Sequence, residues 1–472
     1  MAKETTNVKI PATIVSPANL IAVLESANFC SELTLFGINR PKFTYITNFV
    51  TNLRIKMRVL LPLFISIFLF SCAKGTNFKA RKPSNSSPKT TEISLYKPKK
   101  TVFVKNGDLQ MHEYVALLKG KKVGLVVNQS SMIGKTHLID SLIALEINVK
   151  KIFAPEHGVR GNADAGELVS DDVDAKTGLP IISLYGNHKK PTMKDLDSID
   201  VLVFDLQDVG VRFFTYISTM HYVMEACAEK KIPLIILDRP NPNGDYVAGP
   251  VLDTNYRSFI GMHPIPIVHG LTVGELALMI NGEKWLKDSL KTDLHIIKCK
   301  NYTHDSIIPL AIKPSPNLTN LNAIRWYPSI CLFEETQVSV GRGTLFPFEV
   351  YGGPQLDSSK YVFSFTPISI HGMSKSPPFM RSKCYGEDFR NTKNTGTLRL
   401  DLIYNAHKNY KGNAVFFGKK NFSYKLFGTN KIIDAIEAGK SLEEIEDMCQ
   451  MELENYKIVR KKYLLYPDFH AK

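Results

Sequence analysis

Short apolar runs alternate with helical segments along the chain from about residue 120 onward. Five runs rich in Val, Ile and Leu predict buried strands, at 122–127, 151–153, 180–184, 201–206 and 232–237. Two segments between them, 138–148 and 216–230, predict helices. A repeated strand–helix–strand order is typical of a parallel sheet wrapped by helices, and strands without a polar face suit a sheet buried on both sides. We therefore expect an α/β domain over about residues 115–270.

The pattern becomes mixed in a second region, about residues 271–472. Thr272 with Glu275 three residues later forms a capping box, which opens a predicted amphipathic helix over 272–281. The rest of the region predicts strands at 294–298, 397–402 and 414–417, and helices at 432–438 and 442–456. A smaller α+β region is expected here.

A 12-residue apolar run at 59–70 follows Met57 and Arg58 and precedes Ser71 and Cys72. A positive start, a short apolar stretch and a small residue before the cut are typical of a secretory signal, here 57–72. The run is too short for a membrane-spanning helix, which needs about 20 apolar residues. The segment LFSC resembles a bacterial lipobox, so we expect a lipid on Cys72; the alternative is a buried core segment with a chance cysteine.

That signal organises the rest of the N-terminal part. Met57 is then the expected start of translation, and residues 1–56 are interpreted as a mis-called upstream extension. Residues 73–114 begin with a stretch rich in Lys, Pro, Ser and Thr, which predicts a flexible tether. The expected product is a lipoprotein anchored to a membrane and facing the periplasm of a Gram-negative bacterium.

The chain carries 59 Lys and Arg residues against 45 Asp and Glu residues, a net charge of +14. Residues 1–100 hold 15 of the basic and 4 of the acidic residues, so the body has a net charge of only +3. A nucleic-acid-binding domain normally carries its own basic face. The sequence therefore argues against nucleic acid as a partner, and it does not determine the oligomeric state.

Polar residues follow each predicted strand of the first domain, and open parallel sheets bind ligands at that edge. They lie at Asn128-Gln129, Glu156-His157, Tyr185-Gly186, Asp205–Gly210 and Asp238–Pro242. A glycine-rich phosphate loop is missing after the first strand, and the histidines have no recognised metal-ligand spacing. We therefore expect neither a cofactor nor a metal.

Several ordered motifs resemble the bacterial exo-β-N-acetylmuramidases, a glycoside hydrolase family that removes terminal N-acetylmuramic acid from peptidoglycan fragments. The motifs are APEHGVRG at 154–161, DLQDVGVRFFTY at 205–216, DRPNPNG at 238–244, HGLTVGELA at 269–277, FEETQVSVGRGTLFPFE at 333–349 and KKYLLY at 461–466. The resemblance implies a Rossmann-like domain, a smaller C-terminal domain and an active-site cleft between them. Glu335 stands where the family usually has glycine, and Gln337 where it has asparagine.

Glycoside hydrolysis needs an acid for the leaving oxygen and a second carboxylate that attacks the sugar or activates water. Glu156 is our candidate acid, with His157 beside it as an orienting or substrate-contacting group. For the second carboxylate, family analogy favours Glu334 over Asp208. Asp208 could instead pair with Arg212.

We expect further residues to bind substrate. Arg212 and Arg342 suit the lactyl carboxylate of muramic acid because a guanidinium can hold a carboxylate through two hydrogen bonds, although either could instead brace a loop. Tyr216 could stack on a sugar face. The remaining candidates are polar residues in loops, Asn128, Asp238, Arg239, Asn241 and Asn317.

Two other functions remain open at this point. One is a different cell-wall hydrolase or amidase that uses the same carboxylates. The other is a non-catalytic lipoprotein that binds muropeptides.

Overall fold

The computed structural model describes residues 103–156, 158–160 and 172–470. Residues 98–472 form one compact unit. The predicted signal, Cys72 and His157 lie outside the described residues. None of the described helices is long and apolar enough to cross a bilayer.

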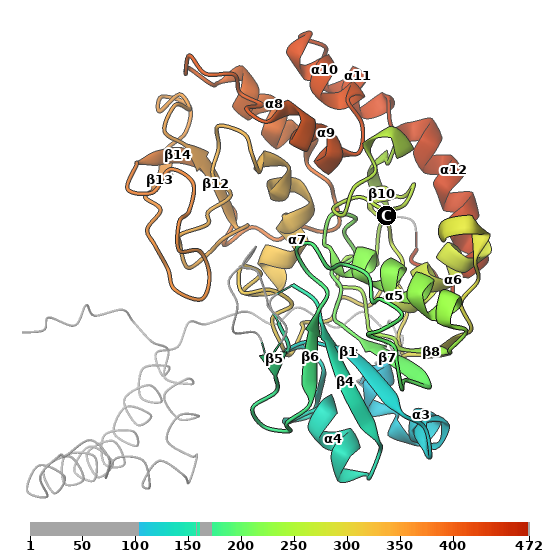
Figure 1. The fold of residues 1–472 in the computed structure, drawn as a ribbon. Coiled ribbons are helices and arrows are strands. Elements are labelled where there is room, and N and C mark those ends of the chain that lie inside the picture. The colour runs from blue at the N-terminus through green and yellow to red at the C-terminus, as the bar shows by residue number, and fades with distance from the viewer. Residues whose placement is uncertain (1–102, 157, 161–171, 471–472) are drawn as a thin grey trace, which may run out of the picture. The chain divides into compact units, whose positions relative to one another are not determined.

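A seven-stranded, mostly parallel sheet organises the N-terminal half (Figure 1). Its strand order is β11 (Leu294–Ile297), β8 (Leu234–Leu237), β7 (Val201–Asp205), β1 (Val123–Val127), β4 (Val149–Ala154), β6 (Pro180–Ser183) and β5 (Asp172–Val173). All neighbours pair in parallel except β5, which pairs antiparallel with β6. The five predicted strands are confirmed, and the α/β fold class with them.

Alternate residues of each strand point to opposite faces of the sheet, and the central strands β1, β7 and β8 are buried on both faces. Val126, Phe204 and Ile236 belong to one core with residues of α5 (Tyr216–Lys230) and α6 (Val273–Gly282). Leu125 and Val203 belong to another core with α3 (Met111–Leu118) and α4 (Leu138–Ala144). The helix pairs therefore cover opposite faces, which explains why the strands carry no polar face (Figure 1).

Two segments extend the sheet domain beyond its expected limits. The strand predicted at 294–298 joins the large sheet as β11, beside β8. Residues 103–114, expected in the tether, pack on the fold: Gly107 N donates to Asp238 O at 2.8 Å, and Tyr114 is fully buried. A Cβ atom at position 107 would lie 2.4 Å from Ile297 O, so this close approach requires glycine.

The C-terminal part combines a small antiparallel sheet with a group of helices (Figure 1). The sheet has the order β12 (Val350–Gly353), β14 (Cys384–Asp388) and β13 (Phe363–Phe365). The helices are α7 (Leu321–Ile330), α8 (Leu400–Lys408), α9 (Lys420–Phe427), α10 (Lys431–Glu437), α11 (Leu442–Asp447) and α12 (Gln450–Arg460). Two short hairpins, β2 (Met132–Ile133) with β3 (Thr136–His137) and β9 (Ala248–Val251) with β10 (Pro266–Val268), complete the strands of the described residues.

Two strand predictions in this part are wrong. Residues 400–408 form α8 where we predicted a strand at 397–402, and residues 414–417 form no strand. Leu400, Leu402, Ile403 and Ala406 are buried, so the apolar residues of 400–408 follow a helical period. The predicted helix over 442–456 is two helices, α11 and α12.

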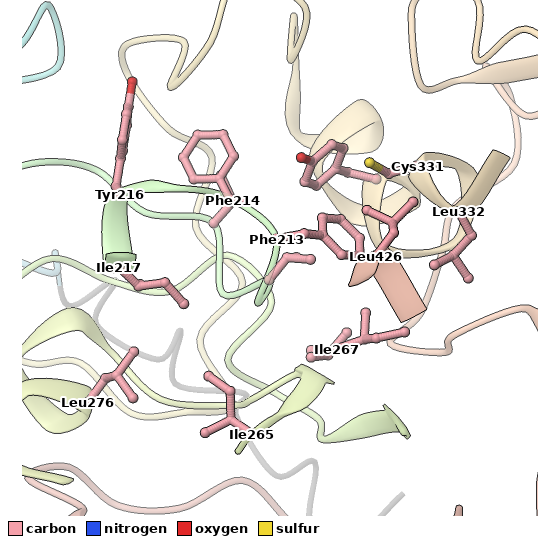
Figure 2. Close-up of a cluster of buried hydrophobic side chains, with 14 of the residues drawn as sticks. Phe213, Phe214, Tyr216, Ile217, Ile265, Ile267, Leu276, Cys331, Leu332 and Leu426 are labelled. Carbon is pink, nitrogen blue, oxygen red and sulfur yellow. The ribbon is translucent and has the colours of Figure 1, made fainter. Parts of the chain in front are cut away.

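The larger core joins segments that are far apart in the sequence. Figure 2 shows Phe213, Ile267, Cys331 and Leu426 in one cluster, although they come from four regions of the chain. The same cluster contains Leu276 of α6. One continuous core therefore connects the large sheet with the C-terminal helices.

Candidate active site

Glu156 lies two residues beyond the end of β4, at the carboxyl edge of the large sheet. Its Oε2 accepts a hydrogen bond from Thr215 Oγ1 at 3.1 Å, and Thr215 is the residue before α5. Tyr185, which follows β6, lies beside the same carboxyl group. Burial and, after it, the Glu156 carboxylate raise the pKa of the Tyr185 phenol, so the hydroxyl remains a donor. Residues next to two neighbouring elements, α5 and β6, thus fix the orientation of Glu156.

A cavity of about 770 Å³ opens in front of Glu156. Tyr185 also lines it from the sheet side. The C-terminal part supplies the rest of the described wall, mainly residues 334–342, 373–378 and 418–422. Glu156 and Glu334 therefore share one cavity, as the two carboxylates of a glycoside hydrolase must. Asp208 is not among the described residues that line it.

Arg342 holds Glu334 in place. Its Nε and Nη2 donate to Glu334 Oε1 at 2.9 and 2.6 Å, and its guanidinium lies 5.1 Å from the centre of the Phe348 ring. Burial lowers the pKa of Arg342, but the charge of Glu334 and the hydrogen bonds to it, together with smaller effects of Cys331 and Tyr327, make the net shift upward. Arg342 therefore stays positive and fixes the position of the Glu334 carboxyl group.

A smaller cavity of about 70 Å³ lies next to the first and shares Glu156 and Arg342 with it. Its other walls are largely aromatic and include Phe213, Phe214, Tyr216, Tyr327 and Phe348. Tyr216 OH accepts a hydrogen bond from Asn128 Nδ2 at 2.8 Å and donates to Pro314 O at 3.2 Å. Of the predicted substrate-binding residues, the structure thus brings Tyr216 and Arg342 to Glu156, with Asn128 behind Tyr216.

Glu335 has a left-handed backbone, with φ at +62°. This conformation costs a residue other than glycine about 1–2 kcal/mol. The Glu335 carboxylate pairs with Lys419 Nζ at 2.8 Å, and both residues line the larger cavity. The pair is exposed, and such pairs contribute only about 0–1 kcal/mol.

Arg212 lies away from the cavity and is fully buried. Its guanidinium donates to four backbone carbonyls, those of Pro250, Ile265, Leu426 and Phe427, at 2.6–3.1 Å. We therefore assign Arg212 a structural role in place of the expected substrate contact. The pairing with Asp208 that we considered is not formed either.

Three residues of the DRPNP loop (238–242) likewise use their side chains in contacts with the protein itself. Asp238 accepts hydrogen bonds from Thr272 Oγ1 at 2.8 Å, Gly274 N at 2.9 Å and Tyr466 OH at 2.6 Å, so it holds the start of α6. The other two residues are also buried: Arg239 pairs with Asp205 and Asp108, and Asn241 donates to Leu271 O. Their contacts are those of a structural loop instead of a substrate site.

Asn317 and Asp208 are both buried, each with one oxygen that has no partner among the described residues. Asn317 Nδ2 donates to Met373 O at 2.9 Å, and Met373 lines the larger cavity. Asn317 therefore supports the cavity wall from behind. Asp208 Oδ2 accepts from Gly210 N at 2.6 Å within its own loop.

Sequence reasoning did not assign a role to four residues that the structure places at the site, namely Tyr185, Thr215, Lys419 and Phe422. Tyr185 follows a predicted strand at the sheet edge, and Thr215 lies inside a recognised motif. Both could therefore have been predicted as site residues from the sequence. Lys419 and Phe422 lie in a segment without a motif. Only the tertiary structure brings them to Glu334.

Comparisons with known proteins match almost the whole described chain. A family model described as exo-β-N-acetylmuramidase NamZ, N-terminal, matches residues 123–322, and its C-terminal counterpart matches residues 325–466. The peptidoglycan β-N-acetylmuramidase NamZ of Bacillus subtilis is 37% identical over 406 residues, which cover 81% of this chain and 95% of that protein. The boundary between the two family models lies near residue 323, after β11. We expected the boundary between the two domains near residue 270.

Two crystal structures of DUF1343 family proteins from Bacteroides fragilis have the same fold. One is 46% identical, covers 78% of this chain and 100% of its own, and has a TM-score of 0.72. The other is 28% identical, covers 77% of this chain and 99% of its own, and has a TM-score of 0.66.

Proposed function

The chain belongs to the exo-β-N-acetylmuramidase family, and we propose that it removes terminal N-acetylmuramic acid from peptidoglycan fragments with Glu156 as acid and Glu334 as the second carboxylate. It is a glycoside hydrolase that acts on peptidoglycan. The observation that carries the assignment of roles is the shared cavity, which both carboxylates line from opposite parts of the fold.

The environments of the two carboxylates support different roles. Glu334 is held by two hydrogen bonds from a guanidinium, which position it to attack the sugar or activate water. Glu156 accepts from the hydroxyl of Thr215 and lies beside that of Tyr185. A carboxyl group positioned by hydroxyl groups at the cavity suits proton transfer to the leaving oxygen.

Kinetics with a chromogenic β-N-acetylmuramide test this assignment, with the matching β-N-acetylglucosaminide as the comparison substrate. We expect the parent protein to cleave only the muramide. Glu156→Gln should lower kcat by about 10²–10⁴-fold on the natural disaccharide, whose leaving oxygen needs a proton, and by less on the chromogenic substrate. Glu334→Gln should also lose activity, whereas Asp208→Asn should keep most of it.

Other outcomes would separate the alternatives. If Glu156→Gln stayed fully active on the natural disaccharide, the acid would have to be another residue. If the parent bound muropeptides without releasing sugar, the chain would be a binding protein. Release of a peptide instead of a sugar with a new reducing end would indicate an amidase.

We also propose that the protein is a lipoprotein anchored through Cys72 on the periplasmic side of a membrane. The apolar run at 59–70 and the LFSC segment support this location. Mass spectrometry of the protein purified from a Gram-negative host should find an acylated Cys72 at the N-terminus. The Cys72→Ser variant should carry no lipid.

A further inference from the structure

The larger cavity extends beyond the two carboxylates to a wall formed by residues 335–337 and 418–422. Backbone contacts join these two segments. Gln337 N donates to Phe416 O at 3.1 Å, and Lys419 N donates to Glu335 O at 3.4 Å. Gln337 Nε2 adds a bond to Val415 O at 3.3 Å. The wall is therefore a defined surface next to Glu334.

Three side chains on this wall suit a saccharide. A sugar hydroxyl both donates and accepts hydrogen bonds, while Lys419 offers only donors and Glu335 only acceptors, so their ion pair can hold two adjacent hydroxyls. Phe422 also lines the cavity, three residues after Lys419 at the start of α9. Phe422 N donates to Lys419 O at 2.8 Å, and both residues line the cavity, which places an aromatic ring near the charged pair.

Stability does not explain this arrangement. Glu335 keeps a backbone conformation that glycine would adopt without strain. Its pairing with Lys419 is solvent-exposed, and an exposed ion pair adds too little to offset such strain. Strained residues that persist beside an active site are often kept for function.

The position of the pair relative to solvent indicates which part of the substrate it contacts. An exo-acting enzyme encloses the terminal sugar and leaves the rest of the glycan directed toward solvent. The aromatic residues that line the small cavity next to Glu156 and Arg342 are buried, so this is the side away from solvent. The side chains of Lys419 and Glu335, which are 71% and 39% exposed, lie on the open side.

We propose that Glu335, Lys419 and Phe422 form the subsite for the leaving saccharide, the N-acetylglucosamine residue next to the scissile bond. This inference rests on the proposed function. The subsite makes this enzyme select substrates by the sugar it releases as well as by the terminal muramic acid.

The experiment compares two substrates with the same terminal sugar. One is the N-acetylmuramyl-β-1,4-N-acetylglucosamine disaccharide, and the other is 4-nitrophenyl β-N-acetylmuramide, whose leaving group has no sugar hydroxyls. For Lys419→Ala and Glu335→Gly, we expect kcat/KM for the disaccharide to fall about tenfold relative to that for the nitrophenyl substrate. Phe422→Leu should lower the same ratio several-fold. Free N-acetylglucosamine should inhibit these variants about tenfold more weakly than the parent.

Lys420→Ala is the matched control, because Lys420 is the next residue and pairs with Asp434 and Glu437 instead of lining the cavity. Its substrate ratio should equal that of the parent. Glu335→Gly removes strain, so misfolding does not account for a lost preference.

An unchanged ratio, or an equal loss on both substrates, would overturn the subsite and leave the muramidase function standing. A parent protein inactive on both substrates would overturn the muramidase function and the subsite together.

Discussion

Asp208 illustrates at the residue scale how burial alone determines the chemistry of a carboxyl group. Its side chain is buried, Oδ2 accepts from Gly210 N, and Oδ1 has no partner among the described residues. Burial raises the pKa of Asp208 to about 7. His269 Nε2 lies 3.9 Å from Oδ2, but burial lowers the pKa of His269 to about 3, so this neighbour is neutral and does not compensate.

This environment predicts a pH-dependent effect of Asp208→Asn. The ordinary pKa of 3.8 applies to the unfolded chain, so the unfolded state loses its proton first as the pH rises. The stability contributed by protonated Asp208 is complete below about pH 4 and is lost as the pH rises through about 7. The amide side chain of the variant cannot ionise and keeps an acceptor for Gly210 N. The free energy of unfolding of the variant should exceed that of the parent at pH 8 by a few kcal/mol, at about 1.4 kcal/mol per pKa unit.

Urea denaturation of both proteins at pH 4 and pH 8 measures this difference. At pH 4 the two proteins should have nearly equal stability. A variant that changes stability equally at both pH values would show that folding does not raise the pKa of Asp208.

At the element scale, local signals predicted the helices better than the strands. The helix at 216–230 and the capping box of Thr272 and Glu275 are both confirmed, because caps and helical periods involve residues close in sequence. The small sheet β12–β14–β13 was not predicted. Its strands are only three to five residues long, and they are stabilised by pairing partners distant in the sequence, with β14 between the other two.

The start of α6 predicts a measurable loss on Thr272→Ala. Thr272 Oγ1 accepts from Glu275 N at 3.2 Å and donates to the buried Asp238 at 2.8 Å, so the variant loses a cap and also leaves Asp238 short of a donor. We expect a loss of about 2 kcal/mol in the free energy of unfolding. Ser441 caps α11 through an equivalent but exposed capping box, so Ser441→Ala should cost only about 1 kcal/mol. Equal losses in the two variants would show that the contact with Asp238 adds nothing.

At the scale of the whole molecule, one core and one buried arginine join the two parts that the family models separate. The core contains residues of the large sheet and of α8 to α12. Arg212 donates to Pro250 O and Ile265 O in the first part and to Leu426 O and Phe427 O at the end of α9. The parts are therefore energetically coupled.

Calorimetry should show one cooperative unfolding transition for residues 98–472, because neither part keeps its core without the other. Arg212→Met should lower the midpoint of this single transition, since it leaves four buried carbonyls without their donor. Arg390→Met, which removes an arginine paired with Asp388 at the surface, is the control and should change the midpoint little. Two separate transitions in the parent would contradict the coupling.

The sequence by itself determined the features that depend on neighbouring residues. Apolar runs defined the five central strands, and the position of Glu156 after one of them placed it at the sheet edge, because parallel strands bring their carboxyl ends together. Motif order indicated the family and pointed to Glu334, which lines the cavity.

Only the tertiary structure decided which polar residues reach the cavity. The recognised motifs also contain Arg212, Asp238, Arg239 and Asn241. The hydrogen-bond partners of these residues include distant segments such as 426–427 and 466, so their side chains bind the protein instead of a ligand. Lys419 reaches Glu335 only because residues 415–419 fold back onto 335–337. Sequence patterns report local periodicity and not long-range contacts, and the latter determine whether a polar group binds a ligand or the protein's own backbone.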